Sequence, residues 1–101
     1  MIIVRGTTPT HEFTIPCNVS EIVNLRISYG QCERELFVKE IGDCQMEGNT
    51  IRVTLTQEDT FSFDCKNSAM IHLRVLLADG TVPETDIIIV KVGKSLNNEV
   101  L

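Results

Sequence analysis

The sequence predicts an all-β chain folded as an antiparallel sandwich of two sheets with one short helical crossover. Apolar and polar residues alternate along most segments, which is the pattern of strands that bury one face. Turn signals containing glycine or proline recur roughly every 8 to 12 residues. The apolar residues are mostly Ile, Val, Leu and Phe, with many Thr beside them, and these residue types favour strands. A chain of 101 residues is one domain.

We expect about seven strands, a number typical of small sandwich domains. They are predicted at residues 10–16, 22–29, 33–41, 44–47, 50–55, 69–78 and 85–92. Residues 1–4 form either a short first strand or an ordered tail. We assign residues 1–93 to the sandwich domain and residues 94–101, which are polar, to a flexible C-terminal tail.

The first half of the chain contains two clearly alternating segments. In residues 10–16, Phe13 and Ile15 share the inward face, and Pro16 ends the strand. Residues 22–29 place four side chains on one face: Val23, Leu25, Ile27 and Tyr29. Gly30-Gln31 then predicts a hairpin turn to the strand at 33–41.

Residues 47–63 contain a turn, a strand and a helical start in immediate succession. Gly48-Asn49 is suited to a two-residue hairpin loop, because both residues tolerate positive φ angles. The following strand places three apolar side chains on one buried face: Ile51, Val53 and Leu55. Thr56 is placed to cap a short helix, and Asp59 to complete a capping box. This helical turn is expected to carry the chain from one sheet to the other.

The second half predicts a long strand followed by a hairpin. In residues 69–78 one face is apolar: Ile71, Leu73, Val75 and Leu77. Asp79-Gly80 is a hairpin signal that leads into the last strand at 85–92. Together these features are typical of an immunoglobulin-like sandwich, with a small barrel as the alternative. The likeness concerns architecture only, because the chain has no Trp and no cysteine pair with the antibody-domain spacing.

The net charge of −5 disfavours nucleic acid and anionic membrane surfaces as partners. The nine Lys and Arg residues are scattered singly and form no basic stripe. Residues 1–4 are too short an apolar run for a signal peptide, and no run could cross a bilayer. We therefore expect a cytosolic protein, unless it leaves the cell as part of an assembly.

The four cysteines, Cys17, Cys32, Cys44 and Cys65, are widely spaced and form no Cys-x-x-Cys pair. This spacing argues against a zinc site or a redox motif. In a reducing cytosol they are expected to be free thiols. No cofactor and no metal is predicted.

The sequence contains no recognisable catalytic motif, and we predict that the protein is not an enzyme. His11 and His72 lie in predicted strands without a nucleophile or carboxylate at motif spacing, so both are interpreted as strand-surface histidines. The acidic residues at 33–35 and 58–59 lack the loop spacing of a calcium site and are interpreted as solvated charge.

The remaining functional candidate is a surface. Residues 87–90 are nearly continuously apolar, as expected where a contact covers the second face of a strand, and Leu76 points outward on the neighbouring predicted strand. We predict a self-association or docking face at five residues: Leu76, Ile87, Ile88, Ile89 and Val90.

Five segments of the chain, taken in order, carry a resemblance to known proteins. They are residues 5–16 (RGTTPTHEFTIP), 19–22 (VSEI), 47–51 (EGNTI), 55–58 (LTQE) and 90–93 (VKVG). In this the chain resembles small proteins of similar length from phages and prophages of Gram-positive bacteria. It is also similar to the N-terminal sandwich domain of upper baseplate proteins of such phages. The resemblance implies a virion-assembly or tail-associated module without chemistry, whose partners are other virion or tail proteins or a second copy of itself.

A different class of function is an exported immunoglobulin-like domain that binds a sugar or a host protein. The missing signal peptide and the lack of aromatic platforms, with no Trp and one Tyr, speak against it. A small hydrolase is the least favoured hypothesis, because no nucleophile has a recognisable base.

Overall fold

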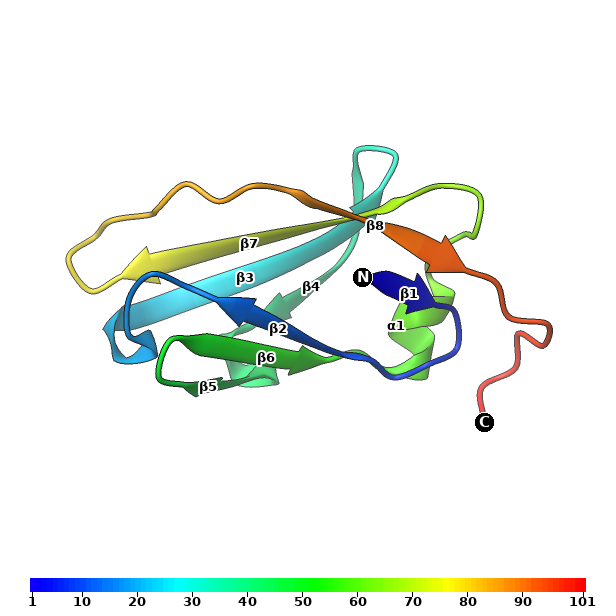
Figure 1. Ribbon diagram of the computed structural model, residues 1–101, viewed down its shortest axis with the longest axis horizontal. Coiled ribbons are helices and arrows are strands. Elements are labelled where there is room, and N and C mark those ends of the chain that lie inside the picture. Colours follow the sequence, from blue (N-terminus) through cyan, green and yellow to red (C-terminus); the bar gives the residue numbers. More distant parts are fainter.

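The computed structural model describes residues 1–101 and is mainly β, with eight strands and one short α-helix. The strands are β1 (Ile2–Val4), β2 (Thr10–Thr14), β3 (Ile22–Gln31), β4 (Arg34–Glu40), β5 (Cys44–Glu47), β6 (Thr50–Thr54), β7 (Ala69–Leu77) and β8 (Ile88–Gly93). The helix α1 is Gln57–Phe61, and single 3-10 turns lie at Val19–Glu21 and Ile41–Asp43. Figure 1 shows these elements along the long axis of the molecule.

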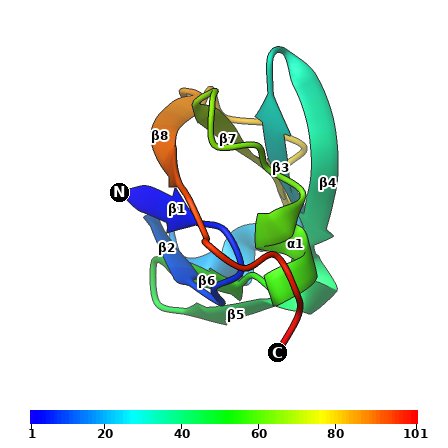
Figure 2. The same cartoon turned by 90° about the vertical axis from the view of Figure 1, so that its right-hand side faces the viewer.

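The strands form two sheets that pack against each other, as Figure 2 shows from one end. One sheet has the order β1-β8-β7-β3-β4 and the other the order β2-β6-β5. Sixteen buried apolar residues form one core between them. The prediction of an all-β, two-sheet chain with one short helix is confirmed.

One strand pair departs from the expected antiparallel arrangement. β1 pairs with β8 in parallel, with Ile2 opposite Lys91. A parallel pair needs a long connection between its strands, and here almost the whole chain supplies it. The hydrophobic period indicates which side chains turn inward but not which strand lies alongside or in which direction, so the sequence did not predict this pair.

The segment from β5 to α1 agrees with the prediction. Gly48 has a φ of +60° in the turn between β5 and β6. Thr56 Oγ1 accepts a hydrogen bond from the Asp59 amide at 3.0 Å, and Asp59 Oδ2 accepts one from the Thr56 amide at 2.9 Å. Such a cap stabilises a helix start by about 1 kcal/mol. α1 connects β6 of the smaller sheet to β7 of the larger one, as expected for a crossover.

The predicted turn at Gly30-Gln31 is wrong, because both residues belong to β3. The turn lies at Cys32 and Glu33, whose φ angles of 52° and 61° are both in the left-handed region. Gly30 is needed for a different reason: a Cβ there would lie 2.5 Å from the Arg34 carbonyl oxygen. The glycine allows β4 to approach β3 closely at a bulge and does not form the turn.

The expected inward position of Val23 is also wrong. The register of β3 against β7 shifts between Ile22 and Asn24, so Ile22 is buried and Val23 is 57% exposed. A bulge of this kind reverses the facing of the residues on one side of it. Leu25, Ile27 and Tyr29 keep their predicted inward positions.

The last strand starts later than predicted. The chain turns after β7, where the Gly80 amide donates to the Leu77 carbonyl at 2.9 Å, but residues 81–87 form no strand. They run beside β7 as an extended coil before β8 begins, as Figure 1 shows. Pro83 lies in this segment and has no amide hydrogen for a ladder, so a continuous hairpin is interrupted there.

Residues 94–101 lie outside the sheets, next to α1 (Figure 2). The Leu101 amide donates to Gln57 Oε1 at 2.8 Å, and Arg5 Nη1 donates to Asn98 Oδ1 at 2.9 Å. The tail is exposed along most of its length, and its flexibility stays a prediction.

Candidate interaction face

The structure places four of the five predicted interface residues on the surface. Leu76 is 37% exposed, Ile87 54%, Ile88 38% and Ile89 70%. Val90 is an exception with 4% exposure and belongs to the core. The reason is the alternation of β8: Ile89 pairs with the outward Met70, whereas Val90 pairs with the buried Ala69.

The three exposed isoleucines, Ile87, Ile88 and Ile89, form what we call the β8 edge patch. β7 pairs with β8 along Ile88–Val90 on one side. On the other side β1 pairs only with Lys91–Gly93, so the isoleucine end of β8 has no neighbouring strand there. The backbone groups of this end are therefore an open sheet edge flanked by apolar side chains.

Leu76 is not part of this patch. Ile88 is the register partner of Ile71, and Leu76 lies five residues further along β7. At the usual rise of a strand this separates them by about 17 Å. Leu76 instead lines a hollow of about 220 Å³ together with Val82. The five residues grouped from the sequence therefore belong to the core and to two separate surface regions.

The outer face of the five-stranded sheet carries three hollows, of about 220, 440 and 370 Å³. Arg74 of β7 lines all three, and Arg26 of β3 lines two of them. Glu35 and Glu40 line the second, and Glu84 and Asp86 line the third. Arg74 thus lies where the hollows of this face meet.

Arg26 and Arg74, which we call the arginine pair, lie directly opposite each other in the β3–β7 register, and both are exposed. Directly opposed residues have Cβ atoms about 5 Å apart, and like charges at such positions repel. Neither guanidinium makes an ion pair, since the two ion pairs of the chain join Lys39 to Asp59 and Arg52 to Glu12. Both arginines alternate with inward apolar residues along their strands, which accounts for their outward positions. Their alignment depends on the register of β3 and β7, which alternation does not specify.

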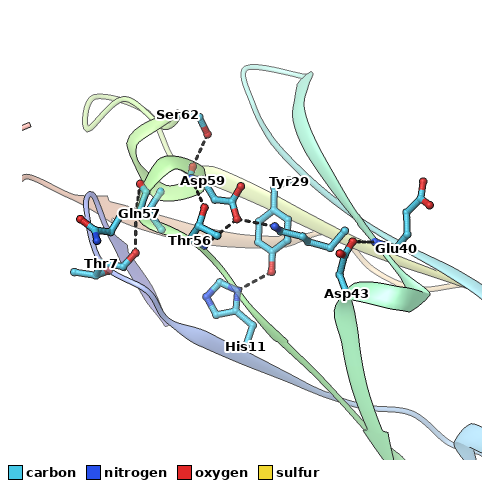
Figure 3. Close-up of polar contacts among 11 residues, drawn as sticks. Thr7, His11, Tyr29, Glu40, Asp43, Thr56, Gln57, Asp59 and Ser62 are labelled. Carbon is cyan, nitrogen blue, oxygen red and sulfur yellow. Dashed lines mark hydrogen bonds and ion pairs between the residues drawn. The ribbon is translucent and has the colours of Figure 1, made fainter. Parts of the chain in front are cut away.

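His11 is not the surface histidine that was predicted. It is 3% exposed, and its Nδ1 lies 2.7 Å from the Tyr29 hydroxyl, as Figure 3 shows. Its Nε2 is buried without a hydrogen-bond partner. Burial lowers the pKa of His11 and raises that of Tyr29. His11 alternates with Phe13 and Ile15 and shares their inward face, so its position in the strand and not its polarity decides its burial.

Other polar groups lie near this buried pair. Lys39 Nζ and Asp59 Oδ2 form an ion pair of 2.7 Å, drawn as a dashed line at Asp59 in Figure 3. Burial raises the pKa of the Cys44 thiol, which therefore stays protonated at neutral pH. None of the three hollows on the outer face is lined by His11, Tyr29 or Cys44. The Lys39–Asp59 ion pair links β4 to α1 on this side of the sandwich.

His72, the second histidine, is half-buried on the outer face and lines a hollow with Glu84 and Asp86. No group of three His, Cys, Asp or Glu side chains is arranged to hold a metal ion. All four cysteines are free thiols, and Cys32 in the β3–β4 turn is the exposed one. The chain has no helix long and apolar enough to cross a membrane.

Comparison with known protein families, with characterised proteins and with solved structures yields no match.

Proposed function

We propose that this chain is a non-enzymatic protein–protein interaction module of a phage or prophage particle, associated with its tail or baseplate. Its partners are other virion or tail proteins or a second copy of itself, and it acts in the cytoplasm of the bacterial host or in the virion. The observation that carries the proposal is the β8 edge patch, an open strand edge with three exposed isoleucines. The order of sequence segments shared with such phage proteins supports the assignment to a particle.

We also propose that the sandwich is immunoglobulin-like in topology. In that fold, strands C, F and G share one sheet, and strands B, E and D the other. Here β3, β7 and β8 are neighbours in one sheet, and β2, β6 and β5 in the other, in the same chain order. The correspondence supports a fold that often serves as a binding scaffold, while function is argued from the surface.

The end of β8 that extends beyond β1 is an apolar, unpaired part of the edge of the larger sheet. An unpaired strand edge tends to pair with another chain unless charge, proline or a covering segment blocks it. The opposite edge, β4, carries four charged residues: Arg34, Glu35, Lys39 and Glu40. The β8 edge patch has no charged residue, so strand addition there combines main-chain hydrogen bonds with burial of isoleucine side chains.

The proposal is tested by light scattering coupled to size exclusion over a range of protein concentrations. We expect the wild-type mass to rise above the 11.3 kDa of the monomer as concentration increases. Ile89→Lys places a charge in the β8 edge patch and should hold the protein at the monomer mass. Val23→Lys is the matched control, because Val23 is also exposed and lies on β3, away from the β8 edge.

A monodisperse wild-type monomer at high concentration contradicts self-association. The remaining partner class is then tested by co-purification with the proteins encoded by the neighbouring genes. Loss of a co-purified tail protein with Ile89→Lys but not with Val23→Lys supports the proposal. Equal loss with both variants, or no tail protein retained at all, overturns it.

A further inference from the structure

The two residues of the arginine pair carry like charges, and neither makes an ion pair within the chain. β3 and β7 hold Arg26 and Arg74 opposite each other at the centre of the outer face. Two guanidinium groups at adjacent positions repel. Glu40 of β4 lies opposite Arg26 in the β3–β4 register, so Arg26 has an acidic neighbour on one side and Arg74 on the other. The chain as a whole carries a net charge of −5, so two adjacent unpaired cations contrast with the rest of the surface.

The hollow of about 220 Å³ beside the arginine pair differs from its two neighbours in charge. Its lining consists of the two arginines, Asn24 and four apolar residues, with no carboxylate. The apolar part is Leu25, Val75, Leu76 and Val82, of which Leu76 and Val82 are exposed. The lining of this hollow therefore combines two cationic side chains with exposed apolar ones.

We infer that this hollow, the arginine pocket, binds a carboxylate side chain that is flanked by an apolar residue on a partner protein. Guanidinium groups match the planar geometry of a carboxylate and bind it through paired hydrogen bonds. The exposed apolar side chains of Leu76 and Val82 cover the neighbouring apolar side chain of the partner. The inference rests on the proposed role as a protein-interaction module and adds the chemistry of the partner.

The surroundings favour a short acidic segment over a long polyanion. Glu35 and Glu40 line the hollow on one side of the arginine pair, and Glu84 and Asp86 line that on the other. A nucleic-acid backbone crossing this face would meet these carboxylates and be repelled. A single carboxylate needs contact only with the arginine pocket, whose lining contains no acidic residue.

The test uses nuclear magnetic resonance titrations of the ¹⁵N-labelled chain with a capped tripeptide, acetyl-Leu-Glu-Leu-amide. The matched probe is acetyl-Leu-Gln-Leu-amide, which has the same shape without the charge. We expect saturable shifts of the amides at Asn24–Arg26 and Arg74–Leu76 with the glutamate peptide, and at least fivefold weaker binding of the glutamine peptide. Arg26→Gln and Arg74→Gln should each weaken glutamate-peptide binding at least fivefold.

Arg34→Gln is the control variant, because it removes an equal charge from an exposed position on β4 and should change binding less than twofold. Equal binding of the two peptides, or binding unchanged by Arg26→Gln and Arg74→Gln, overturns the inference. Tighter binding of a single-stranded oligonucleotide than of the glutamate peptide overturns the assignment to a protein partner. Ile89→Lys should leave peptide binding unchanged, so failure of the arginine pocket is distinguishable from failure of the β8 edge proposal.

Discussion

On the inner face of the five-stranded sheet, β3 and β7 bury Ile27 and Leu73, which are 0% and 7% exposed. On the outer face, the residues between them along the same strands include Arg26, Ser28 and Arg74, all at least partly open to solvent. Successive residues of each strand therefore alternate between the buried core and the solvent-exposed outer face. The inner residues contact many neighbours in a close-packed core, whereas the outer ones make no ion pair.

The contrast shows that the inner face of this sheet supplies packing, whereas the outer face carries the recognition site that we propose. Burial of apolar side chains stabilises the fold and depends on close packing. The outer positions contribute little to that packing, so they are free to hold charges that repel each other. This difference between the two faces is tested most directly by substituting neighbouring residues of one strand and comparing the free energies of unfolding.

The largest effect is expected for Ile27→Ala. Removing this fully buried side chain leaves a cavity and should lower the free energy of unfolding by about 2–4 kcal/mol. Urea denaturation monitored by circular dichroism measures the change. Ser28→Ala, one residue along on the outer face, should alter it by less than about 0.5 kcal/mol. Comparable losses for both variants would contradict the separation of the two faces.

A smaller effect is expected from pH, because a single buried group is involved. Burial lowers the pKa of His11 in the folded state below the 6.5 of the unfolded chain. Just below pH 6.5 the unfolded state therefore binds a proton that the folded state does not bind. The contribution of His11 to stability is complete above pH 6.5 and is lost as pH falls below 6.5 toward the lowered pKa. Urea denaturation between pH 7.5 and 5.5 should show this decline.

His11→Phe should flatten the decline between these pH values, because the titrating group is gone. His72→Gln is the control, since His72 is half-buried on the outer face and its replacement should leave the decline in place. A stability that does not change with pH in the wild type would show that His11 is hydrated in solution.

The smallest effect is expected at the outer face, and with the opposite sign. Arg74→Gln removes the repulsion with Arg26 and should raise the free energy of unfolding by up to about 0.5 kcal/mol. The gain should shrink in 1 M salt, because mobile ions screen exposed charges. Arg34→Gln should give no such gain. A clear loss of stability with Arg74→Gln would mean that Arg74 is paired in solution and would remove the basis for the arginine pocket.

Local patterns in the chain were sufficient for several parts of the fold. The inward positions of Ile51, Val53 and Leu55 follow from period-two alternation, and the structure buries all three. The capping box of Thr56 and Asp59 also followed from the sequence, because it depends on residues three positions apart. Such features need no information about which strand lies alongside.

The candidate site was predicted less well. Val90 was grouped with the exposed isoleucines because the run from residue 87 to 90 is continuously apolar, and such a run does not reveal which face is covered. The arginine pair was missed, because Arg26 and Arg74 are far apart in the chain and meet only through the register of β3 and β7.

By itself the sequence determined the all-β class, the short crossover helix and most of the residues that turn toward the core, since each depends on neighbours along the chain. Tertiary structure decided that β1 lies parallel to β8, that His11 is buried against Tyr29 and that Arg26 faces Arg74. The physical reason is that strand register is set by the packing of one sheet on the other and by bulges that shift it. Whether two surface residues become one site depends on that register.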